Sequence, residues 1–202
     1  MKGSLLDERG MVMVVLLLIV VPLMVAGILL TAEHPRSVHG ADVDLGQAVA
    51  EAVRAAAMCV DDASQAHGDP RVDPDRAHAT LRYILARNLG LSDTTLEPLE
   101  GSGMLSASYV LVVYNGDNAW VPGAREYAFA GGTCSERDLP SGGFPETFAV
   151  EPDGITRGSG ERAVTLDAPG CVAVVRATVR PVLLRENTEA VRWAAAKIVM
   201  TR

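Results

Sequence analysis

The hydrophobic and polar positions divide the chain into two unequal parts. Residues 11–30 read MVMVVLLLIVVPLMVAGILL, twenty residues without a charge, of which fourteen are Val, Leu or Ile. This length matches a helix that crosses the hydrocarbon core of a bilayer. Pro22 is expected to kink the helix, a defect that membrane helices tolerate better than soluble ones. The pattern predicts a transmembrane helix over residues 11–32.

Two other interpretations of this segment fit it less well. A cleaved secretory signal peptide has an apolar core of about 7–15 residues followed by small residues at the cleavage site. Here the apolar core is longer, and Leu30-Thr31-Ala32 matches such a site poorly. A buried core helix of this length would be unusual in a chain of 202 residues.

The charges on the two flanks predict the orientation of the span. Lys2 and Arg9 precede it, whereas Arg36 follows it among acidic residues. Because positive residues stay on the cytoplasmic side, the N-terminus is expected in the cytoplasm. The part from Glu33 onward is then extracytoplasmic, and the protein is expected in the cell membrane as a single-pass protein.

Beyond the span, two stretches show the period of a helix. Residues 42–60 carry apolar residues at helical spacing, which form a possible helix-packing face: Leu45, Ala48, Val49, Ala52, Val53 and Ala56. The polar segment 61–71 is expected to be a loop. Asp73 and Pro74 then supply an N-cap and a first-turn proline for a helix that ends near Leu89, with Gly90 past its end.

From residue 91 onward the pattern predicts strands. Residues 108–114 and 171–184 are the strongest candidates, the second with one dry and one half-exposed face, and residues 126–130, 147–150 and 163–166 are weaker. Residues 189–200 are ambiguous and are assigned as a closing strand. Asn115-Gly116-Asp117-Asn118 is a turn signal.

These elements predict an α+β protein with an N-terminal single transmembrane helix, two further helices and a small, mostly antiparallel β-sheet domain. The expected division is a short cytoplasmic leader over 1–10, the transmembrane helix over 11–32, a helical stem and helix over 33–90, and a β-rich extracytoplasmic part over 91–202 that packs on the helices.

The net charge limits the kinds of partner that the chain can bind. The net charge of −7 argues against binding nucleic acid, which is bound mainly by basic patches.

The chain has three cysteines, an odd number, so one stays free or pairs with another chain. We predict a Cys134–Cys171 disulfide that pins a glycine-rich loop to a strand, with Cys59 free. The alternative, Cys59 with Cys171, would join helix to sheet and leave Cys134 exposed.

No motif of the sequence indicates an active site. The glycine spacing around Ser102 and Ser159 does not fit a nucleophile elbow. The four histidines lack metal-site spacing and are interpreted as solvated loop and cap residues: His34, His39, His67 and His78. Residues 115–118 could offer oxygens to calcium but lack the rest of an EF-hand loop, so a hairpin turn is favoured. We expect no catalytic residue, no metal and no cofactor.

The N-terminal arrangement resembles a known family. A glycine closes the charged leader Asp7-Glu8-Arg9-Gly10, a long apolar helix follows, and residues 48–57 read AVAEAVRAAA. This resembles type IV pilin-like proteins, and more closely the TadE-like proteins of tight-adherence pilus systems. The family's glutamate near the start of the apolar helix is absent, and Val15 and Leu16 stand there.

The resemblance implies a role in the bacterial cell envelope. It implies cleavage by a prepilin peptidase between Gly10 and Met11, and a minor pilin or a pilus-assembly component that contacts other envelope or pilus-assembly proteins. The expected function is non-enzymatic and rests on protein–protein contacts. The alternative is a membrane-tethered binding or sensor module unrelated to pili, and an anchored hydrolase is disfavoured because no motif supports one.

Overall fold

The structure is a computed structural model that describes residues 16–26, 45–179 and 187–198. The chain forms two compact units, residues 1–40 and residues 41–202. In the first unit, residues 16–26 are helical and all of their side chains are exposed. The remainder of the predicted span over 11–32 lies outside the described residues. Among the residues that are described, no helix is long and apolar enough to cross a membrane.

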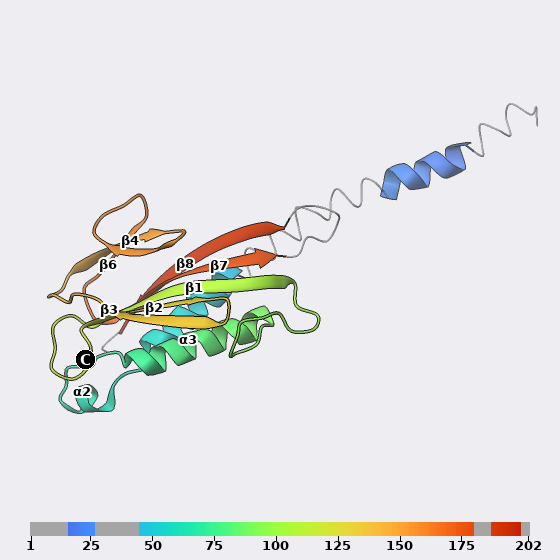
Figure 1. The fold of residues 1–202 in the computed structure, drawn as a ribbon. Coiled ribbons are helices and arrows are strands. Elements are labelled where there is room, and N and C mark those ends of the chain that lie inside the picture. The colour runs from blue at the N-terminus through green and yellow to red at the C-terminus, as the bar shows by residue number, and fades with distance from the viewer. Residues whose placement is uncertain (1–15, 27–44, 180–186, 199–202) are drawn as a thin grey trace, which may run out of the picture. The chain divides into compact units, whose positions relative to one another are not determined.

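The second unit has the predicted α+β composition, with helices first and antiparallel strands after them (Figure 1). Residues 45–57 are helical, and two further helices follow, α2 (Asp62–Ala66) and α3 (Pro74–Leu89). The strands are β1 (Met104–Tyr114), β2 (Ala124–Ala130), β3 (Thr133–Asp138), β4 (Glu146–Glu151), β5 (Gly154–Arg157), β6 (Ala163–Leu166), β7 (Gly170–Val179) and β8 (Thr188–Lys197).

The strands form two sheets in which every pair is antiparallel. The larger sheet has the order β3-β2-β1-β7-β8, and the smaller has the order β5-β4-β6. The smaller sheet is thus built from the segment between β3 and β7. Figure 1 shows α3 on one side of the larger sheet and β4 and β6 on the other.

The domain has two hydrophobic cores, and successive residues of the central strand β1 point alternately into one and the other. Tyr109, Leu111 and Val113 belong to the cluster between sheet and helices. Val112 and Tyr114 belong to a second cluster with residues of the small sheet. Because successive side chains of a strand point to opposite faces, a strand covered on both sides must be apolar throughout. This explains the run YVLVVY.

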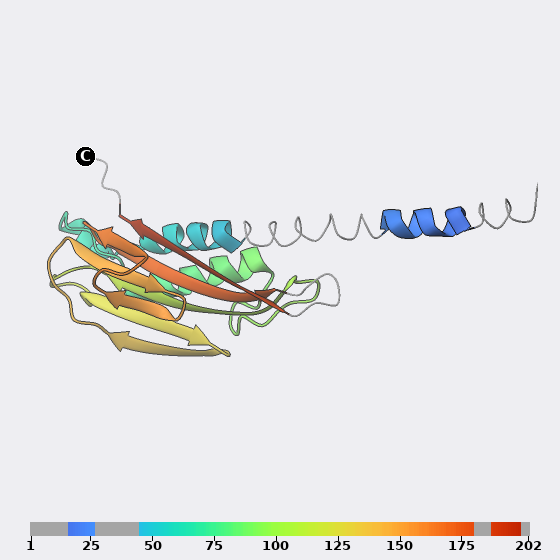
Figure 2. The same cartoon turned by 90° about the horizontal axis from the view of Figure 1, so that it is seen from above.

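The residues of the predicted helix-packing face are buried inside the domain. The six residues of this face on helix 45–57 have at most 3 % of their surface exposed: Leu45, Ala48, Val49, Ala52, Val53 and Ala56. They belong to the same cluster as Ala173 and Ala177 of β7. Small side chains on both elements let helix and sheet approach closely. Figure 2 shows this helix running along the larger sheet.

The second predicted helix is also confirmed. The Asp73 side chain accepts hydrogen bonds from the backbone N–H groups of Asp75 and Arg76, and Pro74 occupies the first turn of α3. Gly90 ends the helix in the left-handed conformation, at φ 66°. That conformation satisfies terminal carbonyl groups and favours glycine. The apolar stripe of α3 is buried at Leu81 and Leu85.

Three segments differ from the sequence prediction. The predicted loop 61–71 contains α2, which begins because the Asp61 carboxylate accepts a hydrogen bond from the N–H of Ser64. The strands β3 and β5 were not predicted. β3 is polar and exposed along almost its whole length, so it shows no alternation and forms only because β2 offers a partner edge. β5 has only four residues.

The two last predicted strands are present. β7 begins at Gly170, and Ala173, Val175 and Ala177 form the predicted dry face, whereas residues 180–184 lie outside the described residues. The other face is half-exposed only from Arg176 onward, because the small sheet covers Val172 and Val174. β8 confirms the closing strand, and residues 199 and 200 are not described.

Candidate functional site

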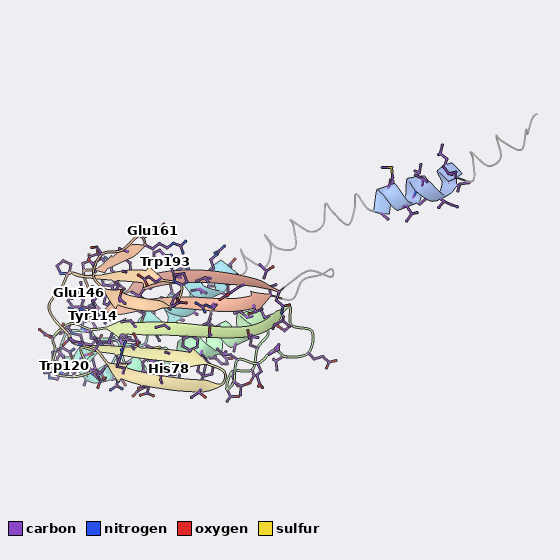
Figure 3. The ribbon with its side chains drawn as sticks, turned by 45° about the horizontal axis from the view of Figure 1, so that its top comes forward. His78, Tyr114, Trp120, Glu146, Glu161 and Trp193 are labelled. Atoms are coloured by element: carbon purple, nitrogen blue, oxygen red, sulfur yellow. The ribbon has the colours of Figure 1, made fainter. Side chains whose placement is uncertain are left out.

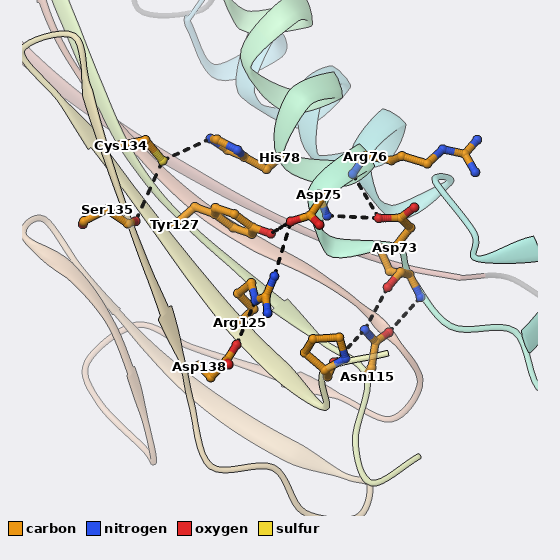
Figure 4. Close-up of polar contacts among 12 residues, drawn as sticks. Asp73, Asp75, Arg76, His78, Asn115, Arg125, Tyr127, Cys134, Ser135 and Asp138 are labelled. Atoms are coloured by element: carbon orange, nitrogen blue, oxygen red, sulfur yellow. Dashed lines mark hydrogen bonds and ion pairs between the residues drawn. The ribbon is translucent and has the colours of Figure 1, made fainter. Parts of the chain in front are cut away.

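A polar cluster lies between the first turns of α3 and strands β1 to β3 (Figure 4). The His78 ring stacks on Tyr127, with ring centroids 4.3 Å apart and planes 8° from parallel. His78 Nε2 lies 2.7 Å from the Tyr109 hydroxyl oxygen and 3.6 Å from Cys134 Sγ. One helix and three strands therefore meet at this imidazole.

A set of charges extends the cluster toward the start of α3. The Tyr127 hydroxyl donates to Asp75 Oδ1 over 2.7 Å. Arg125 Nε donates to Asp138 Oδ1 over 2.8 Å, and its Nη1 lies 3.4 Å from the same Asp75 oxygen. Asp75 lies in the first turn of α3, where a negative charge is favoured by the helix dipole.

Burial determines the protonation of this cluster. Burial lowers the pKa of His78 to about 4. The charge of Arg82 also lowers this pKa, whereas the charge of Asp75 raises it. Burial also raises the pKa of the Cys134 thiol, with a further contribution from Glu136. The pKa of Tyr109 is raised, mainly by burial and then by Cys134. At neutral pH the imidazole, the thiol and the phenol are therefore all uncharged.

This protonation pattern limits what the cluster can do. A nucleophilic cysteine needs a thiolate, which a nearby cation stabilises and burial disfavours. Here the imidazole is neutral and the thiol pKa is raised. The arrangement instead joins α3 to the sheet through one aromatic stack and hydrogen bonds from three strands.

A second cluster surrounds Asn115, which is completely buried. Its Oδ1 accepts from the N–H of Val72 over 2.8 Å, and its Nδ2 donates to the carbonyl oxygens of Val72 and Pro122 over 2.9 and 3.2 Å. Arg71 Nη1 donates to the Asn115 carbonyl oxygen over 2.5 Å. One side chain thus links the segment before α3 to the β1–β2 connection, residues 115–123.

The calcium alternative for residues 115–118 gains no support from these contacts. The Asn115 side chain is used in the core. The Asn118 Oδ1 accepts from the N–H groups of Trp120 and Val121, and the Asp117 carboxylate accepts from the Ser141 hydroxyl. The predicted turn does join two antiparallel strands, but through a connection longer than a tight hairpin.

The histidines differ in their surroundings. His67 is exposed, as predicted, and its Nδ1 lies 2.8 Å from the Ala63 carbonyl oxygen. The prediction for His78 was wrong, because it lies within α3 and is half-buried against Tyr127. His34 and His39 lie outside the described residues. In the part of the chain that the structure describes, no group of three His, Cys, Asp or Glu side chains could hold a metal ion.

The predicted Cys134–Cys171 disulfide is not present, since all three cysteines are free. Cys134 lies on β3 and Cys171 on β7, and β2 and β1 run between these strands. Three strand spacings of about 4.8 Å separate them by about 14 Å, whereas a disulfide requires Cα atoms within about 7 Å. The sequence placed Cys134 in a loop, whereas β3 fixes it in the sheet.

The alternative pair lies in one core. Cys171 is fully buried among the residues between sheet and helices, and Cys59 packs against that cluster. Burial raises the pKa of the Cys171 thiol, and the neighbouring Cys59 raises it further. Cys59 Sγ lies 3.2 Å from the Thr80 hydroxyl oxygen. Because both thiols are free, the Cys59–Cys171 alternative is not present in the structure either.

A groove of about 430 Å³ lies on the face of the larger sheet that the small sheet leaves open. Val110, Ala128 and Val174 contribute to its lining, and Pro152 and Asp153 of the β4–β5 turn lie at its side. Arg176 is held there by ion pairs with Asp153 and with Glu189, the latter at 2.6 Å. Its charge is thus already balanced within the domain.

The predicted cleavage position between Gly10 and Met11 lies outside the described residues. Of all predicted site residues, the structure brings together only the helix-packing face. The His78 and Asn115 clusters escaped sequence reasoning because their members are spread over residues 71 to 138. No family model, no curated protein and no solved structure matches this chain.

Proposed function

We propose that this chain is a single-pass, membrane-anchored extracytoplasmic protein that acts through protein–protein contacts, as a pilin-like or TadE-like component of a pilus-type assembly. The observation that carries the proposal is the contrast between its two units. Residues 16–26 contain no polar side chain, and Leu16 and Leu18 have 60 % and 68 % of their surface exposed. The second unit, by contrast, buries its own apolar residues in two cores.

An apolar helix that exposes leucines needs an apolar environment. Within the uncharged stretch of residues 11–30, each Leu, Ile or Val favours insertion by about 0.3–0.6 kcal/mol. A bilayer, or the packed helices of a filament, supplies that environment. The described polar clusters support a structural role, since their side chains are neutral or paired inside the domain.

The proposed anchor is tested by fractionation. The full chain should remain with membranes after washing with high salt and with alkaline carbonate. Replacing both Leu18 and Val21 by Arg should release it, because each arginine at the centre of a span opposes insertion by about 2.5–3.5 kcal/mol. The matched control is Leu5→Arg in the leader, which should leave retention unchanged. A wild-type chain recovered in the soluble fraction would contradict the anchor.

The pilin-like role is tested by the N-terminus of the mature protein. Cleavage after Gly10 gives a chain that starts at Met11, and Gly10→Val should block it, whereas Gly3→Val should not. A mature chain that starts at Met1 favours the plain anchor of the second candidate, a tethered binding or sensor module. The groove beside the β4–β5 turn is the observation that favours that candidate. A start near Glu33 would indicate a cleaved signal peptide.

A further inference from the structure

The larger sheet ends in two very different edge strands, β3 and β8. Three of the six residues of β3 are charged, Glu136, Arg137 and Asp138, and all three are exposed. Charged side chains are the usual protection of an edge against further strand pairing. Residues 191–196 of β8 read VRWAAA and contain a single charge. Over its ten residues β8 has three charges, Glu189, Arg192 and Lys197, so charged side chains are denser on the β3 edge.

The β8 edge is long and apolar. β8 has ten residues, none of which is buried, and among the described strands it pairs only with β7. Trp193 has 37 % of its surface exposed on the same face as Val191 and Ala195, which pack against the core under the small sheet (Figure 3). An edge of this kind presents unpaired backbone groups to another strand.

The sequence of β8 is complementary to itself in one antiparallel register. With Trp193 opposite Trp193 of a second copy, Glu189 lies opposite Lys197 and Val191 opposite Ala195, each twice. Aromatic pairs and opposite charges are favourable cross-strand neighbours. A shift that centres the pairing on Arg192 would place two like charges directly opposite each other, which is unfavourable.

We propose that two copies of this chain associate through their β8 edges, antiparallel and centred on Trp193, so that the two larger sheets become one continuous sheet. The association has two-fold symmetry, the commonest form among soluble homo-oligomers. In the single domain, Arg192 Nη1 donates a hydrogen bond to the Val191 carbonyl oxygen. Where strand pairing uses this oxygen as an acceptor, the bond from Arg192 is replaced by one from the second copy.

The helix layer lies close to the proposed pairing. An added Cβ at Gly46 would lie 3.7 Å from Cδ of Arg192, so helix 45–57 reaches β8 near the proposed axis. Helical spacing places Ala50 on the same side as Gly46, the side that faces β8. Pairing of the two β8 edges therefore also brings the two copies of this helix side by side, at the usual interhelical distance of about 8–10 Å.

The arrangement is compatible with two anchors in one membrane. The start of helix 45–57 lies close to Arg192 and so close to the two-fold axis, which brings residue 45 of both copies to the same face of the joined sheet. The twelve residues 33–44 reach at most about 40 Å when extended. The association does not itself depend on the anchor, so its test and the fractionation test fail separately.

Register-specific cross-linking of the full chain in mild detergent tests the proposal. All variants carry Cys59→Ser and Cys134→Ser, to remove the two half-buried native thiols. Trp193→Cys should form a disulfide-linked dimer on mild oxidation, because directly opposed Cα atoms lie about 4.5–5.5 Å apart. Val191→Cys and Ala195→Cys should each form no disulfide-linked dimer alone, since the two equivalent residues lie about 13 Å apart in the paired edges. A mixture of these two variants should form a linked heterodimer.

Two further results complete the test. Sedimentation velocity of the full chain should give a dimer, which Trp193→Lys converts to a monomer, whereas Ser135→Lys on β3 leaves it unchanged. If Trp193→Cys does not fold, the Val191→Cys and Ala195→Cys mixture still reports the register. A monomeric wild type, or a Val191→Cys chain that links to itself as well as Trp193→Cys does, would overturn the proposal.

Discussion

Single side chains decide how the connections between elements are held. Asn115 is the clearest case, because it satisfies both backbone groups of Val72 and also the Pro122 carbonyl in the buried interior. An amide side chain is suited to this role because it carries a donor and an acceptor together. Its neighbours would be left buried without a partner if it were removed.

We therefore expect Asn115→Ala to lower the free energy of unfolding by about 2–4 kcal/mol, since a buried group left unpaired costs about 1–3 kcal/mol. Urea unfolding followed by circular dichroism measures the change. The control is Asn88→Ala, an exposed residue that donates to Glu51, which should change stability by less than about 0.5 kcal/mol. Equal effects of the two variants would contradict the role of Asn115.

His78 should make stability depend on pH. Its pKa is lowered from 6.5 to about 4 in the folded chain, mainly by burial. Between these values the unfolded chain binds a proton that the folded chain does not, so stability rises with pH in this window. The contribution is fully present above about pH 6.5 and is lost as the pH falls toward 4.

The comparison that isolates this effect is wild type against His78→Gln. The difference between their free energies of unfolding should increase from pH 4 to pH 6.5 and become constant above about pH 7.5. Other titrating groups act equally on both proteins and cancel. A difference that does not change with pH would show that His78 titrates normally in the folded chain.

At the scale of elements, the register of β7 and β8 depends on close backbone contact. An added Cβ at Gly170 would lie 2.3 Å from the Ala196 carbonyl oxygen and 2.9 Å from Cα of Lys197. Real Cβ atoms do not approach backbone this closely, so an alanine would force the two strands apart at the start of β7.

We expect Gly170→Ala to lower the free energy of unfolding by about 1–3 kcal/mol, the usual range for overpacking. The matched control is Gly154→Ala in β5, where an added Cβ would meet no heavy atom within 4 Å. That control should be nearly neutral. Thermal unfolding of the two variants provides the measurement, and a neutral Gly170→Ala would mean that β8 can move away from β7 at little cost.

For the whole molecule, the decisive feature is that residues 41–202 form a compact unit with two cores of their own. A shortened chain that begins at Ala41 should therefore fold and remain soluble without detergent. Its thermal unfolding should be cooperative, and the midpoint temperature should equal that of the same unit in the full chain. Aggregation of the folded shortened chain would show that residues 1–40 cover a surface of this unit.

Local pattern in the sequence determined much of this fold. The helical spacing of residues 45–56 located a packing face, because burial of one side of a helix leaves a 3.6-residue period. The Asp73 cap and Gly90 marked the limits of α3, since both act within one turn. The all-apolar run in β1 indicated a strand covered on both sides, and the structure has a layer on each.

What the sequence left open depends on neighbours distant in the chain. β3 has no apolar period and becomes a strand only by pairing with β2, and that pairing places Cys134 three strands away from Cys171. His78 looked like a solvated residue until Tyr127 and Tyr109 closed around it. The edge position of β8 is likewise fixed by strand order. Pairing order and burial come from long-range contacts, and these only the tertiary structure decided.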